Sequence, residues 1–185
     1  MEKMENDETT WRVVNKMIAA NANTVFNAID YEPSAKLLAY AASNTVLILD
    51  PTCTTATLRS STRTSIQTPK VLFALNTHTT RVNGVQWLSP SVIVSIGGDE
   101  KVIVVWRADG DSRAPTSWKA HQVIPGEESG HKATLTHLRA FYVSEEEQYF
   151  TTMDVGGDLR LWSLNDSKFV IKASLMFGRN LQETT

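Results

Sequence analysis

The sequence is poor in cysteine and has no apolar run long enough to cross a membrane. Its single cysteine, Cys53, cannot form an internal disulfide, which fits a reducing compartment. The first ten residues are acidic and polar, so they do not resemble a secretory signal peptide. The formal net charge of −2 gives no general attraction to nucleic acid. We therefore expect a protein of the cytoplasm, with the nucleus as an additional compartment, that binds neither membrane nor DNA.

Side chains at catalytic or metal-binding spacing are also missing. The four histidines and Cys53 include no ligand pair at the spacing of a metal site. The pairs Gly97-Gly98 and Gly156-Gly157 lack the lysine of a phosphate-binding loop, and we interpret them as turns between strands. We therefore predict no catalytic residue, no cofactor and no metal.

What the sequence does contain is a series of short strands between His78 and Trp106. The segment R-V-N-G-V-Q-W alternates in the manner of a half-buried strand. The runs V-I-V-S-I and V-I-V-V-W follow, separated by a turn at 97–99. Continuous Val and Ile indicate strands that are covered on both faces. Three strands joined by tight turns, with a His in front and a Trp at the end, are typical of one blade of a WD-repeat β-propeller.

In such blades, a hydrogen-bonded network of side chains holds the entering loop against the sheet. Its members are a His, a Ser or Thr on the second strand, a turn Asp and usually the Trp. We predict this structural network at His78, Ser95, Asp99 and Trp106, and in the next blade at His131, Thr152 and Trp162. The same Ser, His and Asp could be drawn as a nucleophile, base and orienting acid. Nothing in the sequence resembles a nucleophile elbow, however, so we favour the structural interpretation.

The strand pattern occurs three times and defines the predicted fold. His78 and His131 lie 53 residues apart, which exceeds the roughly 40–45 residues of such a repeat and implies insertions. Upstream, Leu49-Asp50 stands where a Trp-Asp pair would end the first blade. We predict an all-β chain, a partial WD-repeat β-propeller of about three four-stranded antiparallel blades. Its expected parts are a disordered acidic tail with a candidate clasp strand at 1–16, blade one with a Ser/Thr-rich insertion at 17–77, blade two at 78–130, and blade three with the start of a connection to a missing blade four at 131–185.

Two places depart from the WD pattern. Without gaps, Val105 rather than Trp106 falls on the blade-end aromatic position, so Trp106 sits across a bulge or the register slips there. In blade three, Gly156 stands where the turn Asp is expected, with Asp154 and Asp158 on either side. The network of blade three is therefore either weakened or rebuilt.

One further tryptophan is a candidate for contact with a partner. Trp118 lies on the predicted outer strand at 117–124, and an aromatic side chain on an outer strand is a suitable anchor for a protein interface. Of the two interpretations, we favour packing of Trp118 against the edge of its own blade.

The order of these motifs resembles the family of Elongator complex subunit two. The resemblance covers about residues 17–180 and is clearest at 37–51 and 78–104, although the loop at 52–70 is longer than in that family. It implies a non-catalytic scaffold that docks other Elongator subunits, subunits one and three in particular. That assembly modifies wobble uridines of transfer RNA through a different, catalytic subunit, so the resemblance implies only indirect contact with tRNA.

A WD-repeat adaptor of an unrelated assembly, such as a vesicle coat or a ubiquitin ligase, is the alternative, because a fold alone does not define a function. Three blades also leave sheet faces and edges uncovered. We therefore expect the isolated chain to self-associate or to depend on partners.

Overall fold

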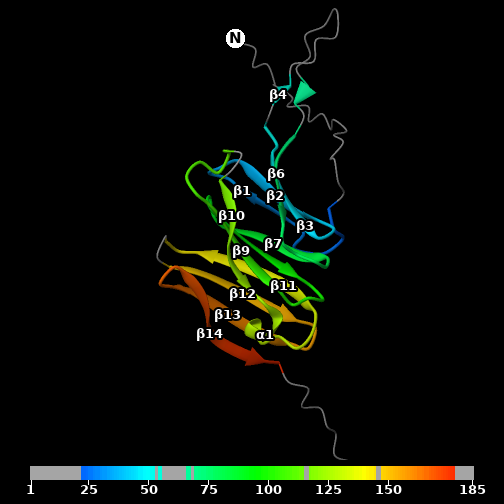
Figure 1. Ribbon diagram of the computed structural model, residues 1–185, viewed down its shortest axis with the longest axis vertical. Helices are drawn as coiled ribbons and strands as arrows, with labels where there is room; N and C mark the ends of the chain where they lie inside the picture. Colours follow the sequence, from blue (N-terminus) through cyan, green and yellow to red (C-terminus); the bar gives the residue numbers. More distant parts are fainter. Residues whose placement is uncertain are drawn as a thin grey trace, which may run out of the picture.

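The computed structural model describes residues 22–52, 54–55, 66–67, 69–114, 117–144 and 147–177. Within them, three four-stranded antiparallel sheets follow one another along the chain and pack in series (Figure 1). Each sheet is one blade, and the predicted all-β class with three blades is confirmed. The tail and clasp strand predicted at 1–16 lie outside the described residues.

Each blade takes its four strands in chain order. Blade one contains β1 (Ile29–Glu32), β2 (Leu37–Ala42), β3 (Thr45–Asp50) and β6 (Lys70–Asn76). Blade two contains β7 (Val82–Ser89), β8 (Val92–Gly97), β9 (Ile103–Ala108) and β10 (Trp118–Ile124). Blade three contains β11 (Leu135–Tyr142), β12 (Gln148–Asp154), β13 (Asp158–Asn165) and β14 (Lys168–Met176).

Two small elements lie outside this pattern. The Ser/Thr-rich insertion of blade one forms a two-stranded antiparallel sheet from β4 (Thr54–Thr55) and β5 (Ile66–Gln67). The short helix α1 (Gly126–Ser129) follows β10 and ends at Gly130, whose φ of 68° is left-handed. In the parts of the chain that the structure describes, no helix is long and apolar enough to span a membrane.

The burial of the strands follows from their place in the series. All six residues of β8 are buried, because blade two packs against blade one on one side and blade three on the other. This explains its continuous Val and Ile. In β12, by contrast, buried and half-buried residues alternate, since among the described strands only blade two covers this sheet. Two apolar clusters hold the blades together, one between blades one and two and one between blades two and three.

A β-bulge recurs at the same place in each blade, between the third and fourth strands. The pairing shifts by one residue opposite Ile48 and Leu49 in blade one, opposite Val105 and Trp106 in blade two, and opposite Leu161 and Trp162 in blade three. A bulge bends its strand and increases the local twist. The shared bulge therefore gives the three outer strands a common distortion and marks equivalent positions in the three repeats.

Backbone hydrogen bonds join the entering loop of each blade to the turn of the blade before it. The amide of Val82 donates to the carbonyl of Ser43 at 2.9 Å, and the amide of Leu135 donates to the carbonyl of Gly98 at 3.0 Å. Both acceptors lie between the second and third strands of the preceding blade. Repetition of this bond ties the start of blades two and three to the turn of the blade before each.

Candidate functional site

Three of the four side chains predicted for the network of blade two lie in one buried hydrogen-bonded chain. His78 Nε2 lies 2.8 Å from Ser95 Oγ, and Trp106 Nε1 donates to the same oxygen at 2.8 Å. The exposed fractions of these residues are between 0% and 4%. The entering loop, the second strand and the third strand each supply one member, so the chain ties these three parts of the blade together.

The fourth predicted member is wrong: Glu100, not Asp99, completes the network. Glu100 Oε1 lies 2.5 Å from His78 Nδ1, and its other carboxylate oxygen accepts from the amide and the hydroxyl of Thr79. Asp99 is exposed and instead accepts a hydrogen bond from Thr134 of blade three at 3.0 Å. Asp99 therefore links two blades and is not part of the hydrogen-bonded network of its own blade.

The turn length explains the difference. Ile96 pairs with Ile103 across this turn, which leaves the six residues 97–102, whereas the equivalent turn of blade three holds the five residues 154–158. The extra residue shifts every later position by one. The strand pairing also decides between Val105 and Trp106 for the blade-end position, because Trp106 pairs with Ile93 as Trp162 pairs with Phe150 in blade three. Trp106 therefore occupies the blade-end position.

Burial and the carboxylate act in opposite directions on the titration of this network. Burial lowers the pKa of His78 below its ordinary value, although the hydrogen bond and the charge of Glu100 oppose the shift. Burial alone would raise the pKa of Glu100, but the hydrogen bonds from Thr79 and His78 outweigh it and hold that pKa below its ordinary value. A neutral His78 that donates to Glu100 and accepts from Ser95 satisfies all three groups.

Ser95, His78 and Glu100 are hydrogen-bonded in the order of a nucleophile, a base and an orienting acid, but a substrate cannot reach Ser95. Ser95 is fully buried, and its oxygen already accepts the N–H of Trp106. A nucleophile must reach a substrate with an oxygen that is free to attack. The arrangement therefore fastens the blade and presents no reactive oxygen at the surface.

Blade three repeats the chain of His, hydroxyl and indole. His131 Nε2 lies 2.7 Å from Thr152 Oγ1, and Trp162 Nε1 donates to that oxygen at 2.9 Å. All three residues are buried. The three positions predicted from the sequence are thus brought together in this blade.

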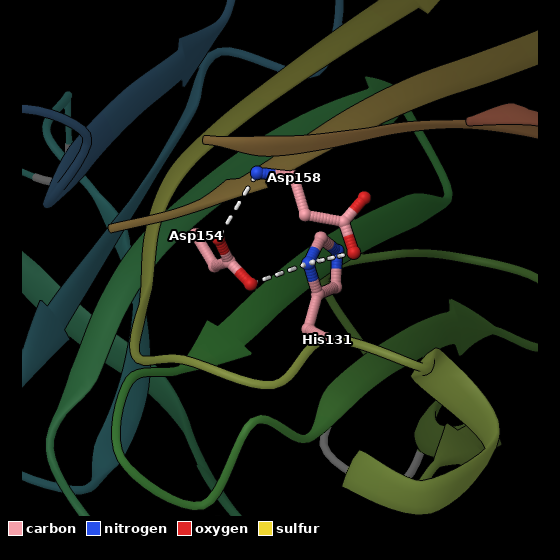
Figure 2. Close-up of side chains that lie close together, drawn as sticks. All are labelled: His131, Asp154 and Asp158. Atoms are coloured by element: carbon pink, nitrogen blue, oxygen red, sulfur yellow. Dashed lines mark hydrogen bonds and ion pairs between the residues drawn. The ribbon is translucent and has the colours of Figure 1, made fainter. Parts of the chain in front are cut away.

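Two aspartates rebuild the acidic part of the network around Gly156. Asp154 Oδ2 lies 3.4 Å from His131 Nδ1, and Asp158 Oδ2 lies 3.7 Å from the same nitrogen (Figure 2). The Arg160 guanidinium donates two hydrogen bonds to Asp158 Oδ2, at 2.7 and 3.0 Å. The two carboxylates replace the single turn acid, and Arg160 balances the second charge.

Backbone amides keep Asp154 ionised despite its burial. Burial alone would raise the pKa of Asp154, but hydrogen bonds from the amides of Asp158, Ala133 and Gly156 and from His131 outweigh it and lower the pKa. Burial also lowers the pKa of His131, with Asp158 opposing the shift. Neutral His131 between two carboxylates is consistent with both directions.

The same three side chains are a group that could hold a metal ion by residue type. One ligand atom from each of His131, Asp154 and Asp158 lies within 4.8 Å of the others, and all three residues are buried. Most of their hydrogen-bonding capacity is already used, however. Asp154 accepts three backbone amides, and Asp158 has the guanidinium of Arg160 beside it. A cation here would compete with Arg160, so we assign the cluster to the structural network.

Blade one lacks the network. Tyr40 pairs with Leu47 at the register position of Ser95 and Thr152, and Leu49 takes the position of the two blade-end tryptophans. The Tyr40 hydroxyl is buried and has no hydrogen-bond partner among the described residues. The network is therefore present in the two blades that have a described blade on the preceding side and absent from the one that does not.

Trp118 lies in the core and does not present a surface to a partner. It is 9% exposed, its ring contacts Trp87 edge-on at 5.6 Å, and it lies 6.5 Å from the Phe73 ring. Its Nε1 donates to the carbonyl of Ser112 at 2.9 Å. Trp118, the first residue of β10, belongs to the apolar cluster at the seam, or interface, between blades one and two.

Sequence reasoning missed a second set of polar groups, which join the inner strands. Asp30 Oδ2 accepts from the amide of Trp87 at 2.7 Å, and Gln86 Oε1 accepts from the amide of Ala140 at 3.0 Å. Each side chain on one inner strand thus satisfies a backbone group on the inner strand of the next blade. A polar residue within an otherwise apolar first strand is the signal that could have revealed this role.

The fold and the two His–hydroxyl–Trp chains define a class: the chain is a partial WD-repeat β-propeller. No protein-family model matches it. It is similar to Elongator complex protein 2 of Drosophila melanogaster, with 25% identity over 161 residues, which cover 86% of this chain and 17% of the relative. The crystal structure of Saccharomyces cerevisiae Sqt1 has a similar fold, with a TM-score of 0.57, 16% identity, and coverage of 86% of this chain and 39% of the other.

Proposed function

We propose that this chain is a non-catalytic scaffold module of an Elongator-type assembly, in which it docks other subunits. The observation that carries the proposal is the extent of the similarity to Elongator complex protein 2, which covers 86% of this chain and thus extends over all three blades. The chain spans 17% of the length of that relative, so the module corresponds to a part of it. Ser95 and His78, which could be drawn as a nucleophile and a base, support the proposal, because both are engaged in holding blade two together.

By the same resemblance, the partners are Elongator subunits one and three, and contact with transfer RNA is indirect through the catalytic subunit. We propose the cytoplasm, and also the nucleus, as the site of action. The composition agrees with indirect contact, because a net charge of −2 provides little attraction to phosphate. The process served is the modification of wobble uridines.

The exposed apolar residues at the end of blade three supply a surface for docking. Met176 and Phe177 are 60% and 58% exposed, and Val155 beside them is 65% exposed. The amide of Phe177 donates to the carbonyl of Gly157 at 3.0 Å, which holds these side chains next to the turn that carries Val155. Exposed apolar groups of this density mark protein interfaces.

The test is affinity purification of the tagged full chain followed by mass spectrometry. We expect Elongator subunits to co-purify with the unmodified chain and to be lost from a Met176→Asp, Phe177→Asp variant. Lys119→Gln, a change on an exposed strand of blade two, is the matched control and should retain them. Recovery of vesicle-coat or ubiquitin-ligase components in place of Elongator subunits would support the alternative and refute the proposal.

A further inference from the structure

One face of blade one is buried although no described blade lies on it. We call it the forward face; it consists of Leu38, Tyr40, Ala42, Leu47 and Leu49. Tyr40 and Leu49 are only 1% and 2% exposed, and Leu47 is 9% exposed. Blade two packs against the opposite face of this sheet, through a separate apolar cluster. The main contacts of β2 and β3 are with their own sheet and with β7 of blade two, so no described strand accounts for the burial.

The described chain begins on this face. Ala22 packs against the apolar cluster of the forward face. The next residue fixes the direction of the chain: the Asn23 amide donates to the carbonyl of Ala41 at 2.7 Å, and its side chain exchanges two hydrogen bonds of 2.8 Å with the backbone of Ser43. The first described residues, Ala22 and Asn23, are therefore held beside the forward face.

The preceding segment has the composition to cover an apolar surface. Residues 11–20 read W-R-V-V-N-K-M-I-A-A. Successive side chains of an extended chain point to opposite sides. One side would carry Trp11, Val13, Asn15, Met17 and Ala19, and the other, with both cations, would carry Arg12, Val14, Lys16, Ile18 and Ala20. Ten extended residues reach about 33 Å, more than the roughly 20 Å of a six-residue strand such as β3. The segment is long enough to cross the face.

We propose that residues 11–21 lie across the forward face of blade one and form a cap supplied by the chain itself. The cap would bury the apolar cluster, and a backbone group or the Asn15 amide would provide the hydrogen bond that the buried Tyr40 hydroxyl lacks. Tyr40 stands at the position where blades two and three carry the hydroxyl of the network, on the side of the preceding blade. The cap therefore occupies the place of a preceding blade, and any blade that docks there must displace it.

The first test measures whether the cap protects a thiol on the forward face. In the full chain, Cys53→Ser removes the natural thiol and Leu47→Cys places one in the cluster. We expect slow maleimide labelling, and labelling at least about tenfold faster when Val13→Asp and Met17→Asp put charges on the apolar side of the cap. The matched control, Asn6→Asp with Thr9→Asp, adds the same charges outside the cap and should leave the rate unchanged. Equal rates in all three proteins would overturn the proposal.

The second test needs no destabilised variant. In the Cys53→Ser background, Ala19→Cys is paired with Leu47→Cys and oxidised with copper phenanthroline; Asn6→Cys with Leu47→Cys is the control. An intramolecular disulfide in the first pair but not the second, seen as a monomer that loses two hydrogens in mass, supports the cap. Disulfide-linked dimers alone would show that a second copy covers the face, and no disulfide in either pair would show that another partner does; both results overturn the proposal.

Discussion

The sharpest prediction compares two neighbouring acids in the turn of blade two. Glu100→Ala should destabilise the chain strongly, and Asp99→Ala only slightly. Glu100 contacts His78 and both polar groups of Thr79, and its side chain is 10% exposed, so solvent screens these contacts little. Asp99 is exposed and makes one hydrogen bond to Thr134.

The magnitude follows from what each change leaves behind. Glu100→Ala leaves the Nδ1–H of the fully buried His78 side chain without an acceptor, which costs about 1–3 kcal/mol, and removes the bonds to Thr79, which contribute about 1 kcal/mol more. We therefore expect a loss of about 2–4 kcal/mol. For Asp99→Ala we expect less than about 1 kcal/mol, because exposed polar contacts contribute little.

The assay is an equilibrium urea melt of each full-length variant, followed by tryptophan fluorescence, since Trp106 is part of the network. Glu100→Gln is the graded control: it keeps the shape and one acceptor oxygen, so its midpoint should fall between those of the other two proteins. A melt in which Asp99→Ala loses as much stability as Glu100→Ala would refute the assignment of Glu100 to the network.

Three further outcomes are expected. Burial lowers the pKa of both His78 and His131, so the unfolded chain takes up protons near pH 6.5 while the folded chain does not. The free energy of unfolding should therefore be highest above about pH 7 and fall as the pH drops below about 6.5. Urea midpoints that stay flat or rise on acidification would contradict this. Trp118→Ala should cost about 3–5 kcal/mol by urea melt, because it opens a cavity at the seam of blades one and two, whereas Lys119→Gln on the same strand should change little. Gln122→Ala should cost about 1–2 kcal/mol in the same assay, because it removes two hydrogen bonds of 2.8 and 2.9 Å to the backbone of Phe169; an unchanged midpoint would show that β10 and β14 are held by apolar contacts alone.

The strands were predictable because their signals are local. The Val- and Ile-rich runs around β8 and β9 indicate burial on both faces, and the residues of the turns mark the strand ends. His78 and Ser95 could be placed for the same reason, since each has a fixed position relative to a strand end, whereas the blade-end position stayed open between Val105 and Trp106 until the strand pairing was known. The positions that follow from the period of a repeat are thus readable without coordinates.

The acids were not predictable in this way, because their positions depend on turn length. One additional residue in the turn 97–102 moves the carboxylate from position 99 to 100, and Glu adds a methylene that extends its reach. In blade three, Asp154 and Asp158 replace the missing turn acid; backbone amides hold Asp154, and Arg160 pairs with Asp158. Contacts of this kind join residues whose relative positions are set by the tertiary structure, and no periodic pattern encodes them.

The arrangement of blades in a series has a consequence for how the chain opens. The main contacts of each described blade are with the blades next to it in the series, so the free energy of local opening depends on how many seams, or interfaces with a neighbouring blade, it shares. Blade two shares two, whereas blade three shares one and exposes most of β14. Hydrogen exchange should therefore be slowest in β8 and β9 and become faster toward β14, so that blade three opens first and blade two persists as the last folded part of the chain.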